Sequence, residues 1–259
     1  MFYLDIGGSA SVGVQPTPTH AHGQPTNLGY ANDLVTLEAR RGVTLDLYQT
    51  GCPGETTQTM LYGADACAAN SGSQLARDVT FLLAHRGQSG VVTIDLGFND
   101  LLRCFHAPAI TSACVDPRMA TLSLQLALIL GQLRAAAGPG VLFVGVGHYD
   151  PFLSPRSGVP NANVLAELAV VDRLNHVLEN AYAQYAVPLA DVARAFSMND
   201  TAVTSSNGAV VNTNASRVCA LTWMCPPTGI PNVHPNDAGY RRIAHAIAHA
   251  LDRLLESAS

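Results

Sequence analysis

Residues 2–9, FYLDIGGS, carry the pattern that decides the fold: a short apolar run stops at two glycines, and a serine follows. Apolar runs of this kind, bounded by glycine, are typical of strands buried on both faces of a parallel sheet. Four later segments match the first, at residues 43–48, 91–96, 141–146 and 187–192. The sequence therefore predicts five core strands, the first of which delivers Ser9 into a glycine turn.

Helical patterns of apolar residues lie between these strands, at residues 27–41, 73–84, 120–137, 164–185 and 238–255. Repeated alternation of strand and helix is typical of an α/β protein with a parallel sheet and helices on both faces. No break in composition divides the chain, so we expect residues 1–259 to form a single domain. Residues 198–231 are long for a loop, and their cysteine pair and apolar ALTWM indicate an ordered excursion.

Composition excludes several classes of protein. The 259 residues are 48% hydrophobic and carry a net charge of −5, and all 14 basic residues are arginine. No basic run is longer than an arginine pair, so we expect no nucleic-acid partner. No uninterrupted apolar window reaches about 18 residues, so we expect no integral membrane segment. A neutral or amphipathic small molecule is the partner that this charge balance favours.

Six cysteines fall into three local pairs in loop-like sequence, and none has the spacing of a zinc knuckle. The pairing Cys52–Cys67, Cys104–Cys114 and Cys219–Cys225 requires the least rearrangement of the chain, although six reduced thiols are the alternative. Disulfides form in oxidising compartments. We therefore expect a secreted protein whose signal peptide is absent from this sequence.

Unusual residues stand where the strands end, and ligands bind at the carboxyl ends of parallel strands. Gly7–Gly13 follows the first strand, Gly51–Thr57 the second and Gly97–Asp100 the third, and residues 231–240 precede the last helix. Each could be a simple turn or helix cap. The first is neither a P-loop, because Val14 and Gln15 replace Lys and Ser/Thr, nor a G-x-S-x-G elbow, because Ser11 replaces the last glycine.

Taken together, the four segments supply a serine hydrolase site. Ser9 would attack a carbonyl carbon, and His234 would accept its proton and pass it to the leaving alcohol. The backbone N–H groups of Ser9 and Gly54 and the side-chain amide of Asn99 would form the oxyanion hole. This chemistry needs no cofactor and no metal. His245 and His249 have a spacing able to bind a metal, but no third ligand is apparent in the sequence.

The four blocks are similar to those of the SGNH (GDSL) hydrolase family, above all its secreted actinobacterial-type members. The matching segments include YQTGCPGETTQTM at 48–60, VTIDLGFNDLL at 92–102 and VHPNDAGY at 233–240. The resemblance covers nearly the whole chain. It implies a flavodoxin-like, three-layer fold with a five-stranded parallel sheet in the order 2-1-3-4-5. It also implies the roles given above for Ser9, Gly54, Asn99 and His234.

Two positions depart from the family pattern. Gly8 stands where the family has an aspartate before the nucleophile, so we expect altered rigidity of this loop rather than lost chemistry. Pro231 stands where the family has the acid of the triad, three residues before the histidine. We expect a Ser–His dyad in which the backbone carbonyl of Pro231 orients the imidazole. A remote carboxylate such as Asp200, or an inert site, is the alternative.

The sequence thus predicts a secreted esterase or lipase that acts on a small-molecule or lipid ester through an acyl-enzyme. A polysaccharide O-deacetylase, a phospholipase and a catalytically weak binding module are the alternatives. Rates should rise with pH as the histidine loses its proton near about pH 6–7. His148, after the fourth strand, is a candidate for shaping the leaving-group pocket, and His22 and Trp223 are candidates for walls of the cleft.

Overall fold

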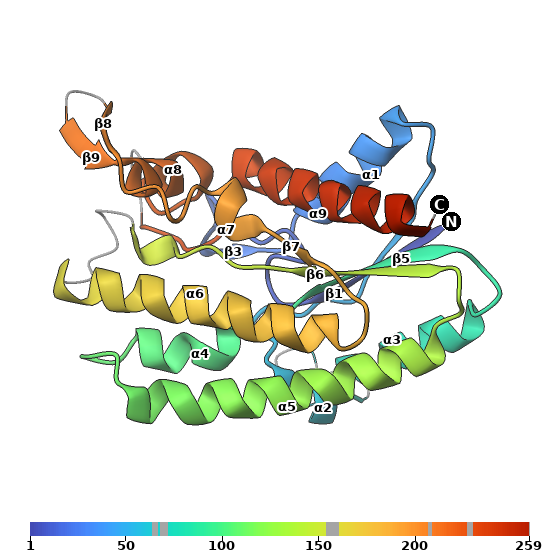
Figure 1. The fold of residues 1–259 in the computed structure, drawn as a ribbon. Helices are drawn as coiled ribbons and strands as arrows, with labels where there is room; N and C mark the ends of the chain where they lie inside the picture. The colour runs from blue at the N-terminus through green and yellow to red at the C-terminus, as the bar shows by residue number, and fades with distance from the viewer. Residues whose placement is uncertain (64–66, 68–71, 154–160, 207–208, 227–229, 259) are drawn as a thin grey trace.

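A five-stranded parallel sheet forms the centre of the molecule (Figure 1). The computed structural model describes residues 1–258 except 64–66, 68–71, 154–160, 207–208 and 227–229. The strands are β1 (Phe2–Gly7), β4 (Asp46–Gln49), β5 (Gly90–Asp95), β6 (Val141–Val146) and β7 (Leu189–Ala190). Their order across the sheet is β4-β1-β5-β6-β7, which is 2-1-3-4-5 when only these strands are numbered. The predicted α/β class and strand order are confirmed.

Helices cover both faces of the sheet, so the fold has three layers (Figure 1). One face packs against α2 (Thr57–Tyr62), α3 (Gln74–Ala84), α4 (Phe98–Phe105), α5 (Ser112–Ala136) and α6 (Asn161–Ala183). The other packs against α1 (Tyr30–Arg40), α7 (Val192–Ala195), α8 (Thr213–Leu221) and α9 (Asp237–Ala258). A short 3-10 helix, η2 (Pro151–Leu153), follows β6.

The side chains of β1 alternate between the two cores, as the period of a strand requires. Leu4 and Ile6 lie in the core with α2–α6, whereas Tyr3 lies in the core with α1 and α9. Asp5 is fully buried on the Tyr3 side, and its Oδ1 accepts hydrogen bonds from the hydroxyls of Tyr30 (2.8 Å) and Thr93 (2.7 Å). Burial raises the pKa of Asp5, and these hydroxyls compensate the buried carboxyl in part.

The structure differs from the sequence prediction mainly at the edges of the sheet. Residues 43–45 do not pair with β1, and the last strand has two residues rather than six. Two antiparallel hairpins were not predicted because their strands are short: β2 (Gln15–Thr17) with β3 (His20–Gln24), and β8 (Val203–Ser206) with β9 (Ala209–Asn212). The helix expected at 120–137 begins earlier, at Ser112, because Thr111 caps it.

The three disulfides connect the expected pairs, Cys52–Cys67, Cys104–Cys114 and Cys219–Cys225. The alternative of six reduced thiols is therefore excluded, and no free cysteine remains. Within the described residues, α5 is the one helix long and apolar enough to cross a membrane. Its apolar residues Leu122, Leu126, Ile129 and Leu133 are fully buried in the core, so we interpret α5 as a core helix.

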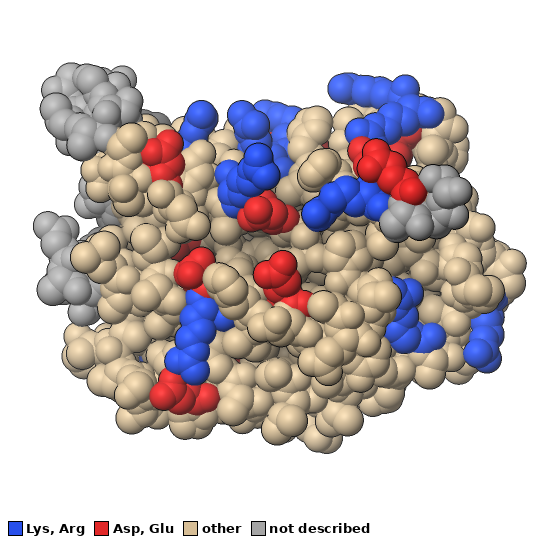
Figure 2. All heavy atoms as spheres, viewed as in Figure 1, with Lys and Arg blue, Asp and Glu red and all other residues tan. Residues whose placement is uncertain are grey.

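Charged side chains of both signs are mixed on the face seen in Figure 2. Arginines gather over α7–α9, where Arg194, Arg217, Arg242 and Arg253 line a shallow hollow. The carboxylate of Asp191 lines the same hollow. Although the net charge of the chain is negative, this part of the surface carries several positive side chains.

β1 and β5 pack tightly against each other where β1 ends, at Gly7. Gly7 has a φ of +139°, and a Cβ on it would lie 2.2 Å from the carbonyl oxygen of Asp95. Neither the backbone conformation nor the space at this position allows a side chain. The next residue continues the contact, because the Gly8 N–H donates to the same carbonyl at 3.0 Å. The absence of a side chain at Gly7 thus allows β1 to lie this close to β5.

We therefore expect Gly7→Ala to destabilise the fold by about 2–4 kcal/mol, since backbone strain and a steric clash add. Gly42→Ala is a matched control, because Gly42 also has a positive φ of +83° but no atom within 4 Å of its Cβ position. The control should cost about 1 kcal/mol. Urea unfolding of the two variants measures the difference. Equal losses would show that close packing at Gly7 is not important.

Candidate active site

Ser9 lies in a tight turn directly after β1. The Val14 N–H donates to the Ser9 carbonyl at 3.0 Å, and the Gly13 N–H donates to Ala10 at 3.1 Å, which closes the turn. Gln74, fully buried at the start of α3, holds the preceding residue: its Oε1 accepts from the Gly7 N–H (2.9 Å) and its Nε2 donates to the Gly7 carbonyl (3.2 Å). Among the described residues, the Ser9 hydroxyl has no hydrogen-bond partner, and Ser9 lines a cavity.

Gly54 lies on the second wall of the same cavity. Its φ is +88°, and no protein atom lies within 4 Å of the position that a Cβ would take. The loop is fixed on both sides, because the Cys52 N–H donates to the Gly7 carbonyl at 2.8 Å and Gln74 Nε2 donates to the Glu55 carboxylate at 3.2 Å. Gly54 is therefore needed for its backbone conformation, and it leaves space toward the cavity.

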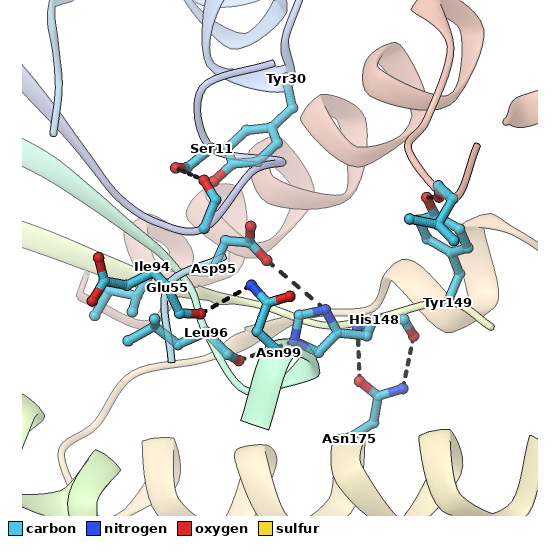
Figure 3. Close-up of polar contacts among 12 residues, drawn as sticks. Ser11, Tyr30, Glu55, Ile94, Asp95, Leu96, Asn99, His148, Tyr149 and Asn175 are labelled. Atoms are coloured by element: carbon cyan, nitrogen blue, oxygen red, sulfur yellow. Dashed lines mark hydrogen bonds and ion pairs between the residues drawn. The ribbon is translucent and has the colours of Figure 1, made fainter. Parts of the chain in front are cut away.

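Asn99 stands in the first turn of α4 and reaches back to the same loop. Its Nδ2 donates to the Glu55 carbonyl at 3.0 Å (Figure 3). A side-chain amide has two N–H donors, so one of them remains for a ligand. The adjacent Asp100 joins the two loops as well, because its Oδ1 accepts from the Thr57 N–H at 3.1 Å at the start of α2. The two loops are thus held together at the cavity wall.

His234 lies in the loop before α9, where the Trp223 N–H donates to its carbonyl at 3.0 Å. Its Nδ1 is 2.6 Å from Oδ1 of Asn232, a residue that is 8% exposed. The same oxygen accepts from the His234 backbone N–H at 3.0 Å, while Asn232 Nδ2 donates to the His22 carbonyl at 3.0 Å. A backbone N–H can only donate and a carbonyl can only accept, so the orientation of the amide is fixed.

The tautomer of His234 follows from this orientation. Because Asn232 Oδ1 is an acceptor, Nδ1 of the imidazole carries the hydrogen, and Nε2 holds the lone pair. Burial lowers the pKa of His234 to about 4, since no charged partner compensates the desolvation of the imidazolium. At neutral pH the ring is therefore neutral and able to accept a proton at Nε2.

The cavity has a volume of about 320 Å³ and brings together all four predicted groups of the site, Ser9, Gly54, Asn99 and His234. These residues come from four chain segments that are far apart in the sequence. Most of the remaining lining is apolar: Ala10, Val14, Leu96, Phe98, Leu102, Val146, Tyr149, Pro151, Val233 and Ile243. The cavity can hold a small ligand with an apolar portion beside the serine and the histidine.

Two predictions about the orientation of His234 need correction. The acceptor for Nδ1 is the side chain of Asn232 rather than the carbonyl of Pro231, because an asparagine two residues before the ring folds back on it. Pro231 itself is exposed. Asp200 is also exposed, its carboxylate accepts from the Ala202 N–H at 3.1 Å, and it is not part of the cavity lining. Only the short spacing Asn-x-His in the sequence could have indicated Asn232.

Of the other residues that the sequence suggested for the cleft, some line the cavity and some do not. His22 and His148 line the cavity, whereas Trp223 does not, and its indole N–H donates to Gln15 Oε1 at 2.9 Å. His245 and His249 are exposed on α9. Within the described ranges of the chain, no group of three or more His, Cys, Asp or Glu side chains is arranged to hold a metal ion.

Solved structures of several other proteins are similar to this chain over almost its whole length. The chain resembles an extracellular lipase from Streptomyces rimosus with a TM-score of 0.62 at 20% identity, covering 96% of this chain and 99% of the other. It resembles phospholipase A1 from Streptomyces albidoflavus with a TM-score of 0.60 at 19% identity, covering 97% and 98%. A carbohydrate acetylesterase from Sinorhizobium meliloti has a TM-score of 0.60 at 15% identity, covering 98% and 99%. These likenesses establish that the chain shares its fold with these hydrolases.

The family follows from the sequence itself. The model of the GDSL-like Lipase/Acylhydrolase family matches residues 6–242, and the chain belongs to this family. It is therefore a carboxylic ester hydrolase. No curated protein matches the sequence.

The hydrogen bonds of Asn232 make a direct prediction for His234. Nitrogen-15 NMR of the imidazole should show Nδ1 protonated and Nε2 unprotonated at neutral pH, with protonation of Nε2 only near about pH 4. The exposed His176 is the internal reference: the carbonyl of Asp172, which lies 2.9 Å from its Nδ1, and the Asp172 carboxylate raise its pKa. The interpretation is wrong if Nε2 carries the hydrogen at neutral pH, or if His234 titrates together with His176.

Proposed function

We propose that Ser9 is the nucleophile of this ester hydrolase and that His234 is its general base and acid. The observation that supports this most is the shared cavity, which the serine, a histidine with its lone pair on Nε2, and two potential oxyanion donors all line. In the free enzyme a hydrogen bond between nucleophile and base is often long, and it shortens when substrate binds.

The reaction would proceed in two halves. In the first, His234 Nε2 takes the hydroxyl proton of Ser9 as Oγ attacks the ester carbonyl, and the same proton passes to the leaving alcohol when the tetrahedral intermediate collapses. In the second, His234 activates a water that attacks the acyl-enzyme, and the carboxylic acid and free Ser9 result. The backbone N–H groups of Ser9 and Gly54 and the free N–H of Asn99 would stabilise the oxyanion of both intermediates.

The apolar lining suits the acyl part of an ester, and we propose a lipase or esterase that accepts an acyl chain longer than acetate. An O-deacetylase would need little apolar space beside the serine. The three disulfides require an oxidising environment during folding, and one of the similar structures is an extracellular lipase. We therefore propose that the protein works outside the cell.

Ser9→Ala tests the proposal. Hydrolysis of p-nitrophenyl butyrate should fall by about 10³-fold or more, because the oxyanion donors alone give only a small residual rate. A fluorophosphonate should label the wild type and not the variant, since it reacts with an activated serine. Ser11→Ala in the same turn does not test the nucleophile. The Ser11 hydroxyl is fully buried and donates a hydrogen bond to the Gly8 carbonyl at 2.7 Å.

Undiminished hydrolysis by the Ser9→Ala variant would refute Ser9 as nucleophile. Absence of both hydrolysis and labelling in the wild type would instead favour a binding module that retains the fold without turnover.

The Asn232 contact predicts the pH dependence of hydrolysis. The neutral imidazole is the active form, and its pKa of about 4 means that kcat/KM should stay level from about pH 8 to about pH 5 and fall below that. The sequence alone predicts the acid limb at about pH 6–7. We expect it at lower pH, because His234 is desolvated beside a neutral partner.

Two substitutions at Asn232 separate its role from simple packing. Asn232→Asp places a carboxylate beside Nδ1, which stabilises the imidazolium, so the acid limb should move up by about one to two pH units. Asn232→Ala should lower kcat by about 10- to 100-fold, because the ring loses its orientation. Asn180→Ala, on the exposed face of α6, is the control and should change neither quantity. An acid limb that stays in place in Asn232→Asp would contradict the role of Asn232.

A further inference from the structure

Two polar side chains in the cavity have no part in the mechanism above. Asp95 is the last residue of β5 and is 8% exposed, and His148 follows β6 and is 9% exposed. Both line the same cavity as Ser9 and His234. Figure 3 shows their side chains directed toward each other beside the amide of Asn99. A polar pair that lines an otherwise mostly apolar cavity is the kind of group that fixes the orientation of a ligand.

The orientation of His148 is fixed by its surroundings. Its Nε2 lies 2.9 Å from the Leu96 carbonyl, which can only accept, so Nε2 carries a hydrogen. Asn175 holds the backbone of His148 from both sides: Oδ1 accepts from the N–H at 2.8 Å, and Nδ2 donates to the carbonyl at 2.8 Å (Figure 3). The remaining ring nitrogen, Nδ1, faces Asp95.

The distance between the two groups is the decisive observation. His148 Nδ1 and Asp95 Oδ1 are 3.8 Å apart, which is longer than a hydrogen bond. They attract each other only as a loose pair, and each keeps hydrogen-bonding capacity toward the cavity. An oxygen atom placed to one side of the line between them can lie about 2.8 Å from both. The gap therefore has the size of one bridging oxygen.

The chemistry of the pair selects the kind of oxygen. Asp95 Oδ1 and His148 Nδ1 both face the gap, and the carboxyl oxygen can accept a hydrogen bond from a group placed there. Burial raises the pKa of the Asp95 carboxyl, while His148 and the Ser11 backbone N–H oppose that shift. A hydroxyl group can both donate and accept a hydrogen bond, so it can bind to the pair. An ether or ester oxygen cannot donate, and a hydrocarbon can do neither.

We propose that Asp95 and His148 bind a hydroxyl group on the alcohol part of the substrate, which makes the enzyme selective for partial esters of polyols over esters of plain alkyl alcohols. The proposal rests on the proposed function, because Asn99 beside the pair is taken as an oxyanion donor. A hydroxyl held here lies near the scissile ester. The apolar remainder of the cavity accepts the acyl chain, which carries no hydroxyl.

A matched pair of substrates tests this selectivity. Glycerol 1-monobutyrate and propyl butyrate share the acyl chain and the three-carbon alcohol skeleton, and they differ in two hydroxyl groups. The wild type should show a higher kcat/KM for the glycerol ester, because the alkyl ester leaves the buried pair without its partner. In Asp95→Leu, whose side chain has no hydrogen-bonding group, the ratio of the two kcat/KM values should fall by about 10- to 100-fold.

Asp78→Leu is the matched control, since Asp78 is a fully buried carboxyl on α3 that does not line the cavity. Its ratio should equal that of the wild type. If Asp95→Leu does not fold, the same comparison in His148→Phe decides. A wild type without preference for the glycerol ester, or variants that retain the preference, would overturn the proposal.

Failure of this inference is distinguishable from failure of the proposed function. In the first case Ser9→Ala is inactive on both esters while the ratio in the Asp95 variant is unchanged. In the second case Ser9→Ala keeps its activity on both.

Discussion

The hydrogen bond from the Gly8 N–H to the Asp95 carbonyl, 3.0 Å long, is the contact on which the arrangement of this site depends. It continues the pairing of β1 with β5 beyond the last strand residue, so the two central strands of the sheet end at the same level. On the other side of the same turn, the Cys52 N–H donates to Gly7. Three chain segments that carry Ser9, Gly54 and Asn99 are therefore joined by backbone hydrogen bonds before any side chain contributes. The oxyanion donors proposed for these segments would therefore need no reorganisation when charge develops.

Gly8, where the family has an aspartate, fits this tight arrangement. A Cβ on Gly8 would lie 3.1 Å from Asn99 Nδ2, so a side chain here would press on the amide that faces the cavity. The turn is restrained by other contacts: Gln74 binds both backbone groups of Gly7, and the Ser11 hydroxyl donates to the Gly8 carbonyl at 2.7 Å. The turn is thus restrained by buried residues of neighbouring segments without a side chain at position 8.

These contacts explain how far the sequence could predict the molecule. Ser9, Gly54 and Asn99 could be placed at one edge of the sheet because parallel strands end at the same edge. This inference needs only the direction of the strands, not the contacts of individual side chains. The edge strands were less predictable, because Asp46 and Tyr48 in β4 are exposed and their alternation does not fix where pairing begins. Asn232 was not identified, because its role depends on a side chain that folds back over two residues and the Asn-x-His spacing is the only sign of it in the sequence. The Asp95–His148 pair joins two strand ends through side-chain directions that sequence periodicity does not give.

The asparagine at position 232 both accepts and donates hydrogen bonds, and an aspartate could not do both. Its Oδ1 accepts from the ring and the backbone of His234, whereas its Nδ2 donates to the carbonyls of Ala21 (3.4 Å) and His22 (3.0 Å) in the β2–β3 hairpin. A carboxylate could replace the first function, but its second oxygen would face two carbonyl oxygens and repel them. His22 and Gly23 form part of the cavity wall, so the amide fixes this wall and the imidazole together. The chain thus gives up the stronger stabilisation of an imidazolium by a carboxylate, and it gains a hairpin held in place over the site.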